Sequence, residues 1–134
     1  MDIVEWHFDL LSKDYIDWLS RHQNDGITFE RFLDVIFYKG VKLFNKSKMH
    51  IYLIAECMRG NETLRKQFIT LWKEWQKKLE NGLDKILPKE ADKEAYAYYL
   101  MLIIDGLTVQ EALSNPDADL NERMKQIVLK GEKQ

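Results

Sequence analysis

The segment from Ala95 to Leu113, AYAYYLMLIIDGLTVQEAL, is apolar on nearly every side when it is drawn as a helix. A helix on the surface of a globular protein shows a single apolar stripe, so a helix that is apolar all round must be covered on more than one face. Its apolar run of roughly ten residues is too short to span a bilayer, which takes about 20. The cover must therefore come from the rest of the chain, a second copy of it, or a bound apolar ligand.

The hydrophobic period is helical throughout, and turn signals divide the chain into several segments. No segment shows the sustained alternation of a strand, so the sequence predicts an all-α fold. A chain of 134 residues fits a single domain, 1–134, with enough mass to bury a core. We expect a six-helix bundle, with helices from Ile3 to His22, from Thr28 to Phe44, from Lys48 to Arg59, from Asn61 to Leu87, from Asp92 to Leu113, and from Asp119 to Gly131.

The helix from Asn61 to Leu87 has the clearest amphipathic pattern. Asn61 is a favoured N-cap, and Gly60 is placed to close the preceding helix. At 100° per residue, its apolar side chains fall on one side, with Trp72 and Trp75 in the middle. The two tryptophans are either ordinary core or the wall of a ligand pocket, and both alternatives stay open here.

Two opposite faces can be assigned on the 95–113 helix. One holds Tyr99 and Ile103, and the other holds small or flexible side chains at Met101, Ile104 and Thr108. The second face suits close contact between identical subunits. The last helix adds the stripe Leu120, Met124, Ile127 and Val128, so the last two helices of two chains are predicted to form an intermolecular four-helix bundle. A larger monomeric bundle would also satisfy this pattern.

Sequence motifs for catalysis, metal binding and nucleic-acid binding are not found. The histidines His7, His22 and His50 lack metal-binding spacing, and His50 is two helical turns from Cys57, too far for direct shared zinc ligation. No cofactor loop or catalytic dyad is visible, so we expect neither an enzyme nor a cofactor. The charge balance, 20 basic against 22 acidic residues, argues against a nucleic-acid surface. The single cysteine and the lack of a signal-peptide pattern indicate a cytoplasmic protein without a membrane partner.

Two carboxylates lie inside apolar runs, Glu56 in IYLIAECM and Asp105 in LMLIIDG. A buried carboxylate must be paired, hydrogen-bonded or neutralised. In the first alternative, each carboxylate reaches a basic side chain or a backbone amide, and Arg59 or Arg65 could serve Glu56. In the second, the carboxylate fixes the polar part of a ligand in an apolar pocket.

The order of these features resembles the C-terminal regulatory domain of TetR/AcrR-type transcriptional regulators. The resemblance is carried by AECMRGNETLRKQF, Ala55 to Phe68, and by YYLMLIIDGLTVQEAL, Tyr98 to Leu113, which contains the motif Asp105-Gly106-Leu107. It covers essentially the whole chain. It departs from the family pattern in one respect: such regulators begin with a helix-turn-helix domain, which this sequence does not contain, so the chain is not expected to bind operator DNA by itself.

The resemblance implies a homodimer made by the last two helices and a pocket for a small hydrophobic or aromatic effector. We predict pocket walls at Phe37, Tyr52, Glu56, Phe68, Trp72, Trp75, Tyr99 and Ile103. We predict the dimer contact at Met101, Ile104, Thr108, Met124, Ile127 and Val128. The alternative is a helical-bundle adapter without a ligand, whose apolar faces all bind protein.

Overall fold

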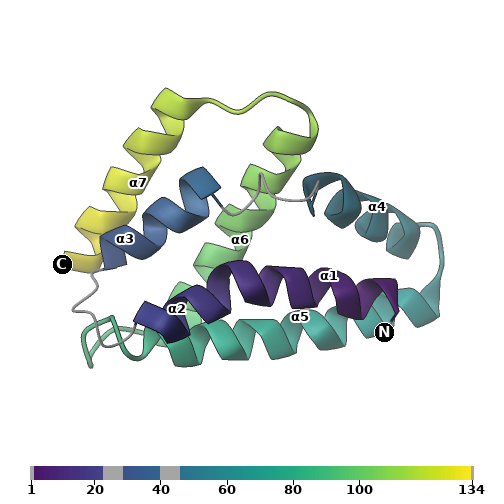
Figure 1. Ribbon diagram of the computed structural model, residues 1–134, viewed down its shortest axis with the longest axis horizontal. Helices are drawn as coiled ribbons and strands as arrows, with labels where there is room; N and C mark the ends of the chain where they lie inside the picture. The colour runs from purple at the N-terminus through teal and green to yellow at the C-terminus, as the bar shows by residue number, and fades with distance from the viewer. Residues whose placement is uncertain (1, 23–28, 40–45, 134) are drawn as a thin grey trace.

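The computed structural model describes residues 2–22, 29–39 and 46–133, and this part of the chain is helical without strands (Figure 1). The first long helix consists of α1 (Ile3–Leu11), the π-helical turn η1 (Ser12–Ile16) and α2 (Asp17–His22). The second consists of α3 (Phe29–Asp34) and the π-helical turn η2 (Val35–Lys39). Four more follow: α4 (Lys46–Met58), α5 (Glu62–Leu83), α6 (Lys93–Ala112) and α7 (Ala118–Lys133). The predicted all-α fold of six helices is confirmed, while the predicted positions of Thr28 and Phe44 lie outside the described residues.

The boundaries of α5 and α6 are set by side-chain caps. The Asn61 carboxamide oxygen accepts a hydrogen bond from the backbone N–H of Leu64 at 3.1 Å, and Asp92 accepts one from Ala95 at 3.0 Å. Gly60 has φ +95°, the left-handed conformation that ends a helix at low cost. These caps confirm the predicted starts of both helices.

The start of α7 differs from the prediction, because Asp117 and not Asp119 is the N-cap. Asp117 accepts a hydrogen bond from the backbone N–H of Leu120 at 2.9 Å, so the helix begins at Ala118 and Asp119 lies in its first turn. A carboxylate in the first turn is also favourable, because it faces the positive end of the helix dipole. Both aspartates therefore fit a helix start, and the side-chain hydrogen bond selects Asp117.

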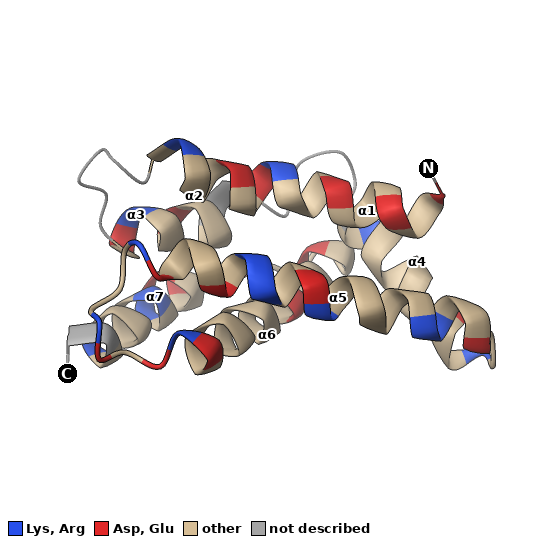
Figure 2. Ribbon diagram, turned by 90° about the horizontal axis from the view of Figure 1, so that it is seen from below, with Lys and Arg blue, Asp and Glu red and all other residues tan. Residues whose placement is uncertain are grey.

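The first long helix lies along α5, and the two form one layer of the molecule (Figure 1). They approach closely at Gly82, where an added Cβ would lie 2.7 Å from Cδ1 of Leu19. The apolar side of α5 turns inward and buries Phe68, Trp75, Leu79 and Leu83. Its other side carries acidic and basic residues (Figure 2). The amphipathic pattern predicted for α5 is confirmed.

Helix α6 packs against both α5 and α4, whereas α7 packs on α3 and η2 (Figure 1). The Lys125 Nζ is 2.8 Å from Asp34 Oδ1, which ties α7 to α3. No helix in the described ranges is long and apolar enough to cross a membrane. The largely apolar helix α6 is covered on one side by α4 and α5.

Candidate functional site

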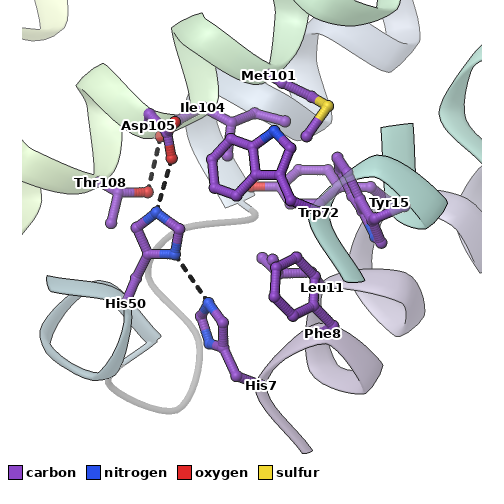
Figure 3. A pocket seen from close by; sticks show the side chains of 11 residues that line it. His7, Phe8, Leu11, Tyr15, His50, Trp72, Met101, Ile104, Asp105 and Thr108 are labelled. Carbon is purple, nitrogen blue, oxygen red and sulfur yellow. Dashed lines mark hydrogen bonds and ion pairs between the residues drawn. The ribbon is translucent and has the colours of Figure 1, made fainter. Parts of the chain in front are cut away.

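A narrow pocket lies where the first long helix, α4, α5 and α6 meet (Figure 3). Its cavity has a volume of about 20 Å³, the room of roughly one water molecule. Most of its wall consists of aromatic and aliphatic side chains, and the remaining lining residues are polar. The lining residues are His7, Phe8, Leu11, Tyr15, His50, Trp72, Trp75, Met101, Ile104, Asp105 and Thr108.

Three titratable side chains from three helices form a hydrogen-bonded row in the pocket wall. His50 of α4 is in the middle: its Nε2 is 2.7 Å from Asp105 Oδ1 of α6, and its Nδ1 is 2.8 Å from His7 Nε2 of α1. Both histidines are buried, and the Asp105 side chain is 29% exposed. The row therefore runs from the edge of the pocket into its interior (Figure 3).

The carboxylate sets the direction of the hydrogen bonds along this row. An ionised Asp105 can only accept, so His50 donates its Nε2–H to it. The Nδ1 of a neutral His50 is then an acceptor, and His7 donates its Nε2–H to it. A single carboxylate thus fixes the tautomers of two buried imidazoles.

An aromatic wall stands beside the histidines. The ring of His50 lies 5.7 Å from that of Trp72 and 5.9 Å from that of Phe68. Phe8 meets Phe68 and Trp72 edge to face, with ring centroids 5.2 Å and 6.3 Å apart. Figure 3 shows Phe8, Trp72 and Tyr15 on one side of the row. Such walls give a pocket affinity for flat apolar molecules.

Tyr15 and Trp75 complete the wall with two further polar groups. Tyr15 lies on η1, and its ring meets that of Trp75 edge to face at 5.9 Å. Burial raises the pKa of the Tyr15 hydroxyl well above its ordinary value, because the charged phenolate would be desolvated. The Tyr15 Oη and Trp75 Nε1 are buried and have no hydrogen-bond partner among the described residues.

The structure brings together some of the residues predicted as pocket walls. Trp72 and Trp75 line the pocket, and Phe68 packs behind it against Phe8 and His50. Phe37 and Ile103 are buried in the core without lining the pocket.

Three other predicted wall residues lie away from it. Tyr52 is exposed on α4, and Tyr99 is exposed on α6. Glu56 pairs with Arg59 one helical turn away, at 3.4 Å on the surface of α4, which is the first of the two alternatives considered for this carboxylate. Asp105 instead meets His50, a partner that the sequence analysis did not consider.

The face of α6 predicted for the dimer turns inward in the structure, whereas the face predicted for the ligand is divided, with Tyr99 exposed and Ile103 buried. Met101, Ile104 and Thr108, expected at a contact between subunits, are 3%, 6% and 6% exposed and line the pocket. The reason is that Asp105 reaches His50, which turns this side of α6 toward α4 and α1. A second copy could not reach these three side chains in this arrangement.

The remaining residues predicted for the dimer lie on α7. Ile127 is exposed, Val128 is buried and Met124 is half-buried. Ile127 and Val128 line an apolar groove between α7 and the first half of α6, together with Tyr99. The groove thus combines one residue predicted for the ligand and two predicted for the dimer.

His7, Tyr15 and His50 are not among the predicted site residues. His7, Leu11 and Tyr15 recur every four residues, so a shared face of the first helix was a usable signal. His50 carried no such signal, because its partners are 43 and 55 residues away along the chain.

The described part of the chain contains no group of three His, Cys, Asp or Glu side chains that could hold a metal ion. No protein family, curated protein or solved structure matches this sequence.

Proposed function

We propose that this chain is the effector-binding and dimerisation domain of a TetR-like transcriptional regulator. The observation that carries the proposal is the pocket, in which three helices contribute His7, His50 and Asp105 to one polar row beside an aromatic wall. The effector is a small hydrophobic or aromatic molecule. It would act on DNA binding by a helix-turn-helix domain that lies outside this sequence.

The row of polar side chains in an apolar pocket supports a binding role, because burying these groups lowers the free energy of unfolding compared with apolar side chains. Removing a carboxylate and two imidazoles from water carries a desolvation penalty that apolar side chains of the same volume would avoid. Binding sites in proteins commonly combine apolar walls with a few fixed polar groups that orient the ligand. The row of His7, His50 and Asp105 and the aromatic wall follow that pattern.

The small size of the cavity supports a sensor rather than a static carrier. A cavity of about 20 Å³ must widen before it admits an organic molecule. Trp72 is only half-buried, and the unbranched Met101 adapts its shape easily, so both are suited to move. A ligand that binds only the widened form shifts the population toward it, and the displaced helices can carry the change to a dimer contact.

A homodimer through α6 and α7 is the second part of the proposal. Both helices expose large apolar side chains, among them Tyr98, Leu102 and Val109 on α6 and Leu120 and Ile127 on α7. In the proposed dimer, the second copy would cover these exposed apolar side chains. The double variant Leu102→Glu with Ile127→Glu should sediment as a monomer where the original chain sediments as a dimer. An unchanged mass would refute this contact.

The binding function is tested by tryptophan fluorescence and thermal unfolding with a panel of uncharged, cationic and anionic aromatic molecules. Saturable quenching that accompanies a higher melting temperature is expected for at least one class. Trp72→Phe and Trp75→Phe should each reduce the quenching, because both tryptophans line the pocket. Trp6→Phe is the matched control, since Trp6 is exposed at the start of α1 and should leave the signal intact.

The alternative function, an adapter without a ligand, is favoured by the same narrow cavity. A bundle that needs no ligand would also close its interior to the volume of a water molecule. Absence of saturable binding across the whole panel, with no change in melting temperature, would select the adapter and reject the sensor.

A further inference from the structure

Two buried hydrogen-bond donors of the pocket lack a partner within the described residues: the Tyr15 hydroxyl and the Trp75 indole N–H. Tyr15 is fully buried, and Trp75 is 3% exposed. Buried polar side-chain atoms almost always have a partner, because leaving one unmatched loses its hydrogen bonds to water. Both residues line the same pocket and their rings are in contact, so a ligand in the pocket can supply the acceptor that these two donors lack.

The Tyr15 hydroxyl and the Trp75 indole N–H both require a ligand atom that accepts a hydrogen bond. An indole N–H can only donate a hydrogen bond. The Tyr15 hydroxyl stays protonated because burial opposes the phenolate, so it also offers a proton. A ligand that satisfies both must present an oxygen or nitrogen lone pair to them.

The charge of the pocket decides between a neutral and an ionised acceptor. Asp105 contributes a carboxylate, which already accepts the His50 N–H, and no Lys or Arg is among the lining residues that the structure describes. A ligand carboxylate would lie near Asp105 without a fixed positive charge. An ammonium group would leave both donors unmatched. An uncharged carbonyl oxygen fits both the donors and the charge.

We propose that the pocket binds an uncharged carbonyl compound with an apolar body, a ketone, ester or amide, whose oxygen accepts hydrogen bonds from Tyr15 and Trp75. This inference rests on the proposed effector-binding function and adds the chemical class of the effector. The aromatic wall of Phe8 and Trp72 receives the apolar body of the ligand. The row ending at Asp105 borders the pocket on its other side (Figure 3).

The test compares three probes of nearly equal size on the full 134-residue chain: acetophenone, ethylbenzene and benzoate. Calorimetry and thermal unfolding report binding of each. Acetophenone should bind at least about 10-fold more tightly than ethylbenzene, because two hydrogen bonds are formed in place of two unmatched donors.

Tyr15→Phe should reduce the preference for acetophenone by about 3- to 10-fold, since it keeps the ring and removes one donor. The same variant without ligand should unfold at an equal or higher temperature, because an unmatched hydroxyl is gone. Tyr98→Phe is the matched control, as it removes an exposed hydroxyl from α6 and should leave the preference unchanged. Trp75→Phe removes the second donor and provides an independent check.

The outcomes separate this inference from the proposed function. Failure of every probe here and of the wider panel would reject the sensor itself. Equal binding of acetophenone and ethylbenzene, or a preference that survives both Tyr15→Phe and Trp75→Phe, would overturn the carbonyl assignment while the sensor stands. If benzoate binds most tightly of the three probes, the pocket prefers an anion, and the assignment of an uncharged carbonyl ligand is wrong.

Discussion

The two faces of α6 are built from similar side chains and have opposite environments. On one face Met101 and Ile104 are 3% and 6% exposed and line the pocket, whereas on the other Leu102 and Val109 are 49% and 39% exposed. Hydrophobicity alone does not distinguish these faces, because either would gain a comparable free energy from burial.

The polar contact of α6 distinguishes them. Asp105 lies at the edge of the inner face and accepts a hydrogen bond from His50, which in turn accepts one from His7. This row can form in only one rotational setting of the helix. A buried polar contact therefore selects which apolar face turns inward, and the other face is left available to a partner.

The largest expected change in the free energy of unfolding comes from placing a charge on each face of α6 in turn. Ile104→Glu should destabilise the fold by at least about 4 kcal/mol, because the carboxylate would be buried without a partner. Leu102→Glu should change the free energy of unfolding of the monomer by no more than about 0.5 kcal/mol. Urea unfolding followed by circular dichroism measures both variants. Similar losses in the two would mean that the faces are not distinct.

Removal of the central histidine is the next largest test. His50→Ala should cost about 3 kcal/mol, since it leaves the Asp105 carboxylate and the His7 ring without the bonds that the imidazole provides. Glu56→Ala is the matched control on α4, where the partner Arg59 is 77% exposed and the pair should contribute no more than about 1 kcal/mol. The measurement is again urea unfolding.

A double-mutant cycle shows whether the row orients α6. His50→Leu combined with Asp105→Leu should lose less stability than the sum of the single variants, because no charge remains unpaired. Additive losses of stability would instead indicate that the two side chains act independently, and that their contact does not determine which face of α6 turns inward.

Alkaline pH tests the other end of the pocket. The pKa of Tyr15 is raised in the folded state, so below the ordinary tyrosine pKa of about 10 the hydroxyl is protonated in both states and stability does not depend on its ionisation. Above that pH the unfolded chain loses the proton first, and stability should fall by up to about 1.4 kcal/mol per pH unit. Tyr15→Phe should remove this contribution, whereas Tyr98→Phe, on the exposed face, should not. A steep decline that persists in Tyr15→Phe would assign it to other groups.

The sequence predicts the amphipathic pattern and the start of α5 well because both signals are local, whereas the helix ends at Leu83, before the predicted end at Leu87. Its charged and apolar residues separate at a helical period, and the Asn61 cap and the Gly60 turn lie within a few residues of the boundary. The all-α fold follows from the same kind of signal repeated along the chain.

The site is harder to predict because its contacts join distant residues. Asp105 stands out as a carboxylate in an apolar run, yet its partner His50 lies 55 residues away on a different helix. The faces of α6 cannot be told apart by period, since both are apolar. Trp72 and Trp75 are found from the amphipathic pattern of α5, whereas His7 and Tyr15 need the packing of α1 on α4 and α5 to be known.

The smallest effect concerns Thr108, the other polar group on the inner face. Its Oγ1 donates a hydrogen bond to the carbonyl oxygen of Ile104 at 2.7 Å, within the same helix. Thr108→Val keeps the shape of the side chain, and the Ile104 carbonyl is still an acceptor within the helix, so unfolding should change by less than about 1 kcal/mol. Urea unfolding checks this. A loss as large as that of His50→Ala would mean that Thr108 shares in orienting α6. A small loss would assign that role to Asp105, whose partner lies on another helix.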